Sequence, residues 1–337
     1  MVKKRLDYID TLKFLAIFAI IAIHSFTLFP HAEILHHEIG ILRQLFRWGV
    51  PVFLLISGAL LLNREINLKI FFKKRFVRIM YPLLFIEIVT FLVFGDTNFL
   101  SANWYAWMIL GAYLAIPIVN KFIQYSDEHE IFYYIIVFVL CSIFWQAMNV
   151  FNINYALDIN FFITPVSYLI LGYYLSTKKF KYSSNMIIII SLILFIITTI
   201  IKLHTGNFMS VYASGVLSSR LDLSFVQIVQ ASSVFLIIKQ LYESDVSAIF
   251  LKIKKFLQKS LCKRFILSVS RASYGMYLIH RLIIIDRLVP FAATLHLTGT
   301  QVCICVAICA VMTFLISWIV IVIMSRIPII KNFSGYA

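Results

Sequence analysis

The sequence predicts an all-α, polytopic integral membrane protein with about ten transmembrane helices and both termini in the cytoplasm. Hydrophobic residues make up 61% of the 337 residues and charged residues 13%, whereas soluble domains are about half apolar and a quarter charged. Apolar runs of about 20 residues recur, each long enough to cross roughly 30 Å of hydrocarbon. These runs lack the alternation of barrel strands, so helices are the expected spanning elements.

The apolar runs place the ends of each expected helix to within a few residues. The N-terminal run follows a basic segment and lacks a small-residue cleavage site, so it is expected to remain as an uncleaved first helix. We expect a single transmembrane domain over residues 1–337 and no soluble domain. The predicted spans are 11–30, 41–62, 76–94, 104–123, 131–150, 161–176, 185–202, 222–241, 266–290 and 301–325.

Lys and Arg residues alternate between the loops as the positive-inside rule requires. The N-terminus and the second, sixth and eighth loops are basic, whereas the first, third, fifth and ninth loops hold no Lys or Arg. The fourth loop has Lys121 at its edge, and the seventh has only Arg220. This alternation predicts an even number of spans with both ends on the cytoplasmic side of an inner membrane.

The net charge of +15 comes from these short basic segments, so nucleic acid is not an expected partner. The longest basic loop, 242–265, has apolar residues among its lysines and predicts an amphipathic helix lying on membrane lipids. Three cysteines, Cys303, Cys305 and Cys309, share one apolar run without metal-ligand spacing or a nearby His. We therefore expect no metal site.

Three titratable residues fall at a similar depth in the predicted membrane. At about 1.5 Å per residue, His24 lies roughly 20 Å into its span, Glu87 roughly 16 Å and His280 roughly 21 Å. Charges at this depth are costly, which makes these residues candidates for function, and a His beside a carboxylate suits general base catalysis. The alternatives are an interhelical hydrogen bond for His24, an Arg partner for Glu87 and an interfacial position for His280.

Basic residues at the inner ends of two spans suit an anionic ligand. Lys13 and His24 are eleven residues apart, close to three helical turns, so both lie on one helix face. Arg75 and Arg78 are three apart and share a face of the third span, and guanidinium groups match phosphate oxygens. The alternatives are a snorkelling lysine and a topogenic cluster that binds lipid headgroups.

Several motifs in the chain resemble those of acyltransferase family 3, whose members are membrane O-acyltransferases of cell-surface glycans. Together they extend from residue 5 to residue 280 and fit the compact form of the family, similar to the enterobacterial common antigen O-acetyltransferase. The motifs are Tyr8-Ile9-Asp10-Thr11-Leu12-Lys13 with Ala16 and His24, Val50-Pro51-Val52-Phe53 with Ser57-Gly58, Arg75-Phe76-Val77-Arg78, Ser273-Tyr274-Gly275-Met276-Tyr277-Leu278-Ile279-His280 and, more loosely, Asn103-Trp104-Tyr105 with Pro117.

The resemblance implies a cytoplasmic acyl-CoA donor, with acetyl-CoA expected, whose phosphates bind Lys13, Arg75 and Arg78. It also implies a glycan or lipid-linked sugar as the acceptor. His24 would either deprotonate the acceptor hydroxyl or carry the acyl group itself. The chain departs from the family pattern at Lys13, where Arg is commoner, at Phe14, where Gly is frequent, and at Arg281, where Pro usually follows the late His.

Glu87 is a candidate from this sequence alone, as a residue that could orient His24. The polar outer half of the fifth span and the 203–221 loop could receive the sugar, or could simply pack at the interface.

The main alternative function is a glycan or exopolysaccharide exporter without acyl transfer, since transporters also place ionisable residues at the midplane. A structural scaffold fits the buried His and Glu poorly. The sequence does not predict an oligomeric state.

Overall fold

The computed structural model describes residues 6–26, 43–95, 103–151, 153–154, 156–205, 222–243, 246–284 and 300–336, together with 288 and 291. The fold is all-α, as predicted, and the described residues form no strand. The helices are α1 (Asp7–Ser25), η1 (Gln44–Phe46), α3 (Gly49–Leu61), α4 (Leu68–Phe94), α6 (Trp104–Tyr125), α7 (Glu128–Val150), α8 (Pro165–Thr177), α9 (Ser184–Thr205), α10 (Phe225–Leu241), α11 (Ala248–Gln258), α12 (Ser260–Ile283), α14 (Thr300–Arg326) and η4 (Lys331–Phe333).

Each of the ten predicted spans overlaps one of the longer helices. Seven helices among the described residues are long and apolar enough to cross a membrane. α8 and α10 are shorter, with 13 and 17 residues, and α12 carries several charged residues. The count of ten spans and the cytoplasmic position of the termini therefore stay predictions.

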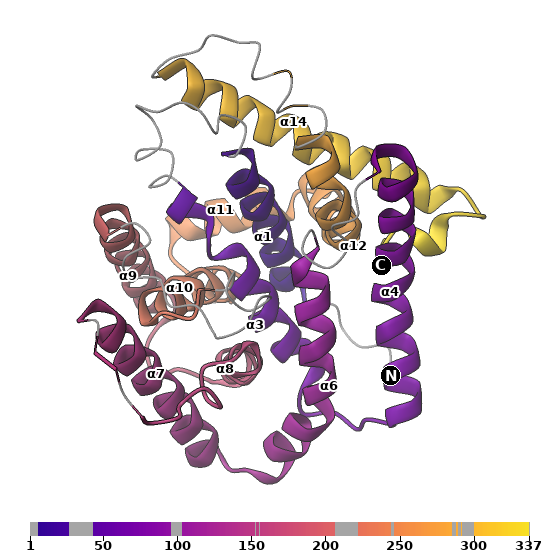
Figure 1. The fold of residues 1–337 in the computed structure, drawn as a ribbon. Helices are drawn as coiled ribbons and strands as arrows, with labels where there is room; N and C mark the ends of the chain where they lie inside the picture. Colours follow the sequence, from indigo (N-terminus) through magenta and orange to yellow (C-terminus); the bar gives the residue numbers. More distant parts are fainter. Residues whose placement is uncertain are drawn as a thin grey trace.

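Helix α1 lies at the centre of the bundle and packs against α3, α10, α12 and α14 (Figure 1). Small residues bring α1 and α3 close together, because a Cβ at Gly49 would lie 2.9 Å from the carbonyl oxygen of Ala16. Close approach through small residues is how helices associate where lipid supplies no hydrophobic drive. The helix that carries Lys13 and His24 is therefore an inner helix of the bundle.

Helices α3 and α8 cross at two glycines. A Cβ at Gly58 would lie 1.8 Å from the carbonyl oxygen of Leu169, and one at Gly172 would lie 2.1 Å from that of Leu55. Neither contact leaves room for a side chain. This crossing fixes α3, whose Phe53 and Ser57 line the candidate site described below.

Helix α4 stands at the edge of the bundle, where it contacts α6, α12 and the C-terminal η4 (Figure 1). The ring of Phe333 stacks on Tyr81 and Phe85 of α4, with centroid distances of 6.0 and 5.3 Å. The following residues reach α12, because a Cβ at Gly275 would lie 2.1 Å from the carbonyl oxygen of Ser334. The segment 331–336 is therefore a wedge between α4 and α12.

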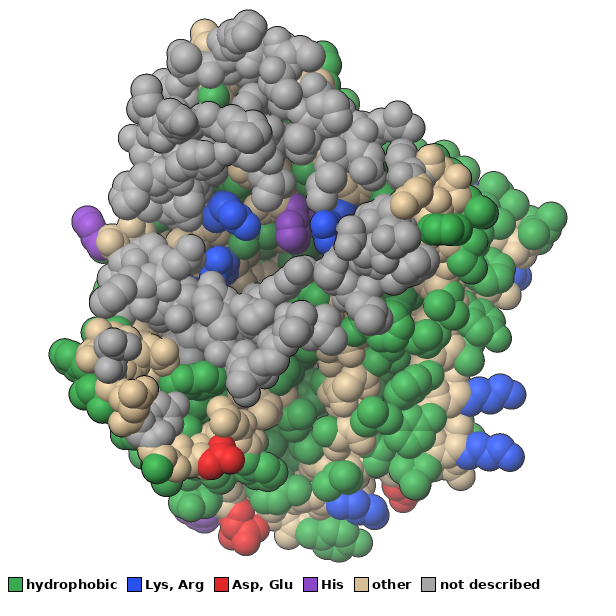
Figure 2. All heavy atoms as spheres, in the orientation of Figure 1, with side chains coloured by type: hydrophobic (Ala, Val, Ile, Leu, Met, Phe, Trp, Pro, Cys, Tyr) green, Lys and Arg blue, Asp and Glu red, His purple; other side chains and the backbone are tan. Residues whose placement is uncertain are grey.

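The face shown in Figure 2 is mainly hydrophobic below its upper part, and charged side chains gather along its lower and right edges. Many large apolar side chains of α4, α7, α9 and α14 remain exposed, including Leu92, Leu140, Ile193 and Ile308. Such an apolar surface on a polytopic chain is suited to lipid. In the upper half of the same face, basic side chains and a histidine are visible in a hollow (Figure 2).

Candidate functional site

A cavity of about 290 Å³ lies between α1, α3, α4, α6 and α12. Five basic residues line it, and among the residues that the structure describes the lining includes no Asp or Glu. Apolar and aromatic side chains such as Ile20, Ile56 and Tyr105 form much of the remaining wall. A lining in which basic residues outnumber acidic ones is suited to a polyanionic ligand.

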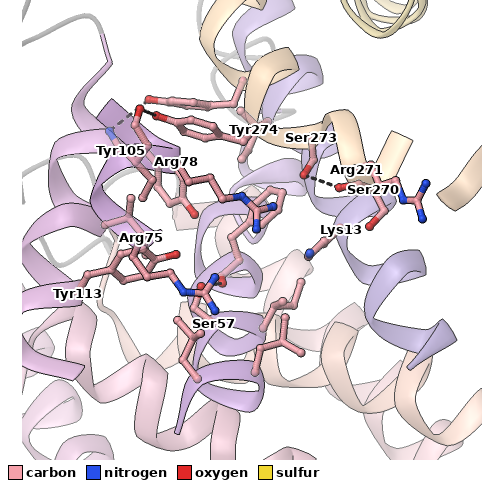
Figure 3. Close-up of a pocket in the computed structure, with 18 of the residues that line it drawn as sticks. Lys13, Ser57, Arg75, Arg78, Tyr105, Tyr113, Ser270, Arg271, Ser273 and Tyr274 are labelled. Carbon is pink, nitrogen blue, oxygen red and sulfur yellow. Dashed lines mark hydrogen bonds between the residues drawn. The ribbon is translucent and has the colours of Figure 1, made fainter. Parts of the chain in front are cut away.

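The structure brings together the three cations that the sequence predicts for phosphate binding. Lys13 of α1 and Arg75 and Arg78 of α4 all line the cavity, and their side chains converge on it from opposite sides (Figure 3). The phenol of Tyr113 on α6 lies beside Arg75 in the same view. Two forked guanidiniums, an ammonium and a phenol thus surround one space.

Sequence reasoning missed the other two cations of the lining, Arg64 and Arg271. Arg64 belongs to the turn between α3 and α4, and in the sequence it counts only as one of the basic residues of the second loop. Arg271 lies on α12, two residues before the late motif, where its side chain extends to the far side of the helix from Arg75 (Figure 3). No spacing within the sequence relates these residues to Arg75, because only the fold brings α3, α4 and α12 together.

The charge of Arg64 is affected by its surroundings. Burial lowers the pKa of its guanidinium, and the neighbouring charge of Arg75 lowers the pKa further. Even so, an arginine remains protonated in proteins. Arg64 therefore adds a like charge to the cluster on α4.

A buried carboxylate supports the cavity from outside its lining. Asp10, one turn before Lys13 on α1, accepts a 2.5 Å hydrogen bond from the hydroxyl of Ser270 on α12. The Asp10 side chain is buried, and Ser270 lines the cavity. This bond ties α1 to α12 beside the cations.

Two tyrosines form the deep wall of the cavity. The backbone N–H of Tyr105 donates to the hydroxyl oxygen of Tyr277 on α12, with 3.2 Å between nitrogen and oxygen, and the two rings meet edge to face with centroids 5.1 Å apart. Since Tyr105 is the second residue of α6, its N–H has no partner within the helix; the N–H therefore donates to the Tyr277 oxygen. Tyr274 ties α12 to α4, because its hydroxyl donates to the carbonyl of Ile79 at 2.9 Å.

The predicted His24 and His280 meet behind this wall, with ring centroids 5.0 Å apart. His280 is fully buried, and its Nδ1 lies 2.5 Å from the carbonyl oxygen of Tyr277. A carbonyl can only accept, so Nδ1 carries the hydrogen and the neutral ring keeps its lone pair on Nε2. Nε2 is buried and has no hydrogen-bond partner among the described residues.

The cavity and the histidine pair are close along α1. Ile20 lines the cavity, and His24 follows it by four residues, about 6 Å along the helix axis. On α12, the ring of Tyr277 lines the cavity and lies 5.7 Å from the ring of His280. Tyr277 therefore separates the cationic cavity from the imidazoles.

Glu87 is buried on α4, and its carboxylate accepts a 2.7 Å hydrogen bond from the side-chain amide of Asn103. This bond joins α4 to the start of α6. The structure therefore gives Glu87 a partner that the sequence did not predict, while its role in orienting His24 stays a prediction.

The predicted acceptor region is only partly described. Gln146 is buried and accepts a hydrogen bond from the backbone N–H of Phe225 at 3.2 Å, which joins α7 to α10. Asn149 is exposed and donates to the carbonyl of Trp145 at 2.8 Å. Asn152 and most of the 203–221 loop lie outside the described residues.

Comparisons with known proteins agree with the resemblance seen in the motifs. A family model described as an acyltransferase domain matches residues 6–323, which include every residue of the cavity and both histidines. Searches of curated proteins and of solved structures gave no match.

Proposed function

The chain belongs to acyltransferase family 3, and from this premise we propose that it is a membrane O-acyltransferase of glycans. The donor is a cytoplasmic acyl-CoA, with acetyl-CoA as the first candidate. The acceptor is a hydroxyl of a cell-surface or lipid-linked glycan. The protein works in the cytoplasmic membrane of a bacterium, among lipids that contact its apolar surface.

The observation that carries this proposal is the acid-free cationic cavity that ends one helical turn from a pair of histidines. Coenzyme A combines a highly anionic nucleotide with a flexible arm that ends in the thioester. Arg75, Arg78 and Lys13 suit the phosphates, while the apolar part of the lining suits the arm. Under the predicted topology, the basic turn before α4 faces the cytoplasm, where acyl-CoA is found.

The transfer requires a base at the deep end of the cavity. His24 accepts the proton of the acceptor hydroxyl while the hydroxyl oxygen attacks the thioester carbonyl. The carbon–sulfur bond then breaks, and the imidazolium of His24 returns the proton to the leaving thiolate. An ester and free coenzyme A result, so atoms and charges balance without a metal or a further co-substrate.

His280 acts as a positioning residue for His24 in this scheme. Its Nδ1 is held by the carbonyl of Tyr277, which leaves the lone pair of Nε2 to accept an N–H from the neighbouring ring. A base oriented by a third group is the usual arrangement in acyl transfer. Glu87 remains a candidate for a more distant supporting role through Asn103.

The first test compares surface glycans from cells with and without the gene by mass spectrometry. We expect a mass increase of one acetyl unit that depends on the gene. Lys13→Ala should raise the KM for acetyl-CoA, and His24→Ala should lower kcat by at least about 100-fold.

Exposed residues supply matched controls for both variants. Lys69 and His129 are exposed and do not line the cavity, so Lys69→Ala and His129→Ala should keep wild-type activity. Wild-type activity in both Lys13→Ala and His24→Ala would refute the mechanism. Glycan export that depends on the gene, without any acyl modification, would favour an exporter instead.

A further inference from the structure

The turn that carries Arg64 is held by side chains of α6. The backbone N–H of Arg64 donates to Oδ1 of Asn120 at 3.0 Å, and Nδ2 of Asn120 donates back to the Arg64 carbonyl at 2.7 Å. Nε2 of Gln124 donates to the same carbonyl at 2.9 Å. Three hydrogen bonds therefore fix both backbone polar groups of one loop residue.

The residue before Arg64 adds to this constraint. Asn63 has a φ of 55°, in the left-handed region that few residues other than glycine adopt. Its side-chain amide donates to the hydroxyl of Tyr173 at 3.0 Å. A backbone conformation of this kind persists when its surroundings determine it, and the residue that follows it, Arg64, lines the cavity.

Asn120 is well suited to this task because its side chain is only 1% exposed. A buried amide must satisfy its donor and acceptor, and Asn120 does so on the backbone of Arg64. Replacing it would leave the N–H of Arg64 without this acceptor and would release the turn.

The cavity gives Arg64 no acidic side chain to pair with among the described lining residues. Gathering Arg64 with Arg75 and Arg78 costs free energy through repulsion, which a bound polyanion would offset. Arg64 lies before the first turn of α4, on the cytoplasmic side of Arg75 and Arg78 in the predicted topology. Its ligand should therefore be the anionic group farthest from the thioester.

We infer that Arg64 binds the ribose 3′-phosphate of the acyl-CoA donor and that Asn120 is the positioning residue that holds Arg64 in place. This inference rests on the proposed function. In coenzyme A the diphosphate lies between the pantetheine arm and the ribose. With the arm in the apolar part of the cavity, the diphosphate reaches Arg75 and Arg78, and the 3′-phosphate reaches Arg64.

The test compares acetyl-CoA with acetyl-3′-dephospho-CoA on the purified full-length protein in detergent. We expect the wild type to bind acetyl-CoA about tenfold more tightly, equivalent to about 1.4 kcal/mol. Arg64→Ala should remove this preference by weakening acetyl-CoA binding alone. Arg64→Lys should restore part of the preference, and Lys69→Ala, which removes an exposed charge from α4, should leave it unchanged.

The role of Asn120 requires its own readout, because a merely structural residue would affect both donors equally. Asn120→Ala should reduce the preference for acetyl-CoA as Arg64→Ala does, with kcat retained. The double variant should lose no more than Arg64→Ala alone, since coupled residues are not additive. If Asn120→Ala does not fold, Gln124→Ala, which removes one of the three hydrogen bonds, should show a smaller loss of the same kind.

The outcomes separate this inference from the proposed function. If the wild type uses acetyl-CoA and Arg64→Ala keeps the full preference for the 3′-phosphate, the inference is wrong and the proposed function stands. Equal losses for both donors in Asn120→Ala would overturn the positioning role. A wild type that neither binds nor uses any acyl-CoA would overturn both.

Discussion

At the scale of single residues, the clearest chemical asymmetry lies within the His280 ring. One nitrogen is fixed by the Tyr277 carbonyl, and the other is buried without a hydrogen-bond partner among the described residues. A buried polar atom without a partner usually marks a functional or unfilled position. The ring of His24 lies next to it, so the two imidazoles are close enough to act together in one site.

Replacing His280 should affect the chemical step more than donor binding. We expect His280→Ala to lower kcat by about 100-fold with little change in the KM for acetyl-CoA, because misplacing a reacting group by about 1 Å has an effect of this size. Steady-state kinetics over a range of pH values provides the measurement, with His129→Ala as the control. A higher KM with unchanged kcat would instead assign His280 to donor binding.

The Lys202–Asp222 pair concerns stability rather than chemistry. Lys202 Nζ lies 2.9 Å from Asp222 Oδ2, and both side chains are 3% exposed. Gln227 also accepts a hydrogen bond from Lys202, so the charge is well satisfied. The pair joins the end of α9 to the segment that leads into α10.

Removing one member of this pair should leave a buried charge without compensation. We expect Lys202→Met to destabilise the protein by about 3–5 kcal/mol, and Lys202→Met combined with Asp222→Asn to recover part of the loss. Thermal unfolding in detergent measures this, with the exposed Lys181→Met as the control. A single variant as stable as the wild type would show that the pair does not join α9 and α10 energetically.

At the scale of helices, the crossing of α3 and α8 sets the shape of the cavity. Gly58 and Gly172 each lie against the backbone of the other helix, so the separation of these helices is determined by the absence of two side chains. Phe53 and Ser57 of α3 line the cavity, so a change in the separation of α3 and α8 would also move these two side chains.

Adding one methyl group at this crossing should separate the helices. Gly172→Ala should lower both the unfolding temperature and the activity, because its Cβ would lie 2.1 Å from the Leu55 carbonyl oxygen. Gly111 provides a matched control on α6, since a Cβ there meets nothing within 4 Å. Gly111→Ala should instead be neutral or stabilise by about 0.5–1 kcal/mol. Equal effects of the two changes would contradict the proposed close packing.

Helix α11 has an amphipathic sequence pattern, but its apolar face remains exposed. A helix in the basic loop 242–265 was expected, and α11 forms within it. Ile249, Ile253 and Phe256 lie on one face and remain exposed, beside the exposed Lys252 and Lys255. An apolar stripe bordered by lysines is typical of a helix on an anionic membrane surface, and this position stays a prediction.

At the scale of the whole molecule, the sequence predicts the positions of the helices along the chain better than the contacts between them. Apolar runs locate the long helices because composition and length determine them. Depth along the membrane placed His24 and His280 in one layer, and the structure puts them side by side. Depth carries no information about rotation or neighbours, which explains why the bond between Glu87 and Asn103 was not foreseen.

The cavity could be predicted only in part for the same reason. Lys13, Arg75 and Arg78 stand in recognisable motifs on helix faces, whereas Arg64 depends on the hydrogen bonds from Asn120, which is 56 residues away. Arg271 belongs to the predicted span 266–290, but only the fold shows that it lies at the cavity. The resemblance to family motifs added order along the chain but no contacts between its segments.

The wedge formed by residues 331–336 has a consequence for the timing of assembly. Translation proceeds from the N-terminus, so this segment leaves the ribosome after every helix that it supports. Until Phe333 reaches Tyr81 and Phe85, α4 lacks the stacking contacts that this segment provides. The candidate cavity on α4 therefore gains this support only after residues 331–336 have been synthesised, and a chain that ends after Arg326 would hold the helices that line the cavity without the wedge beside them.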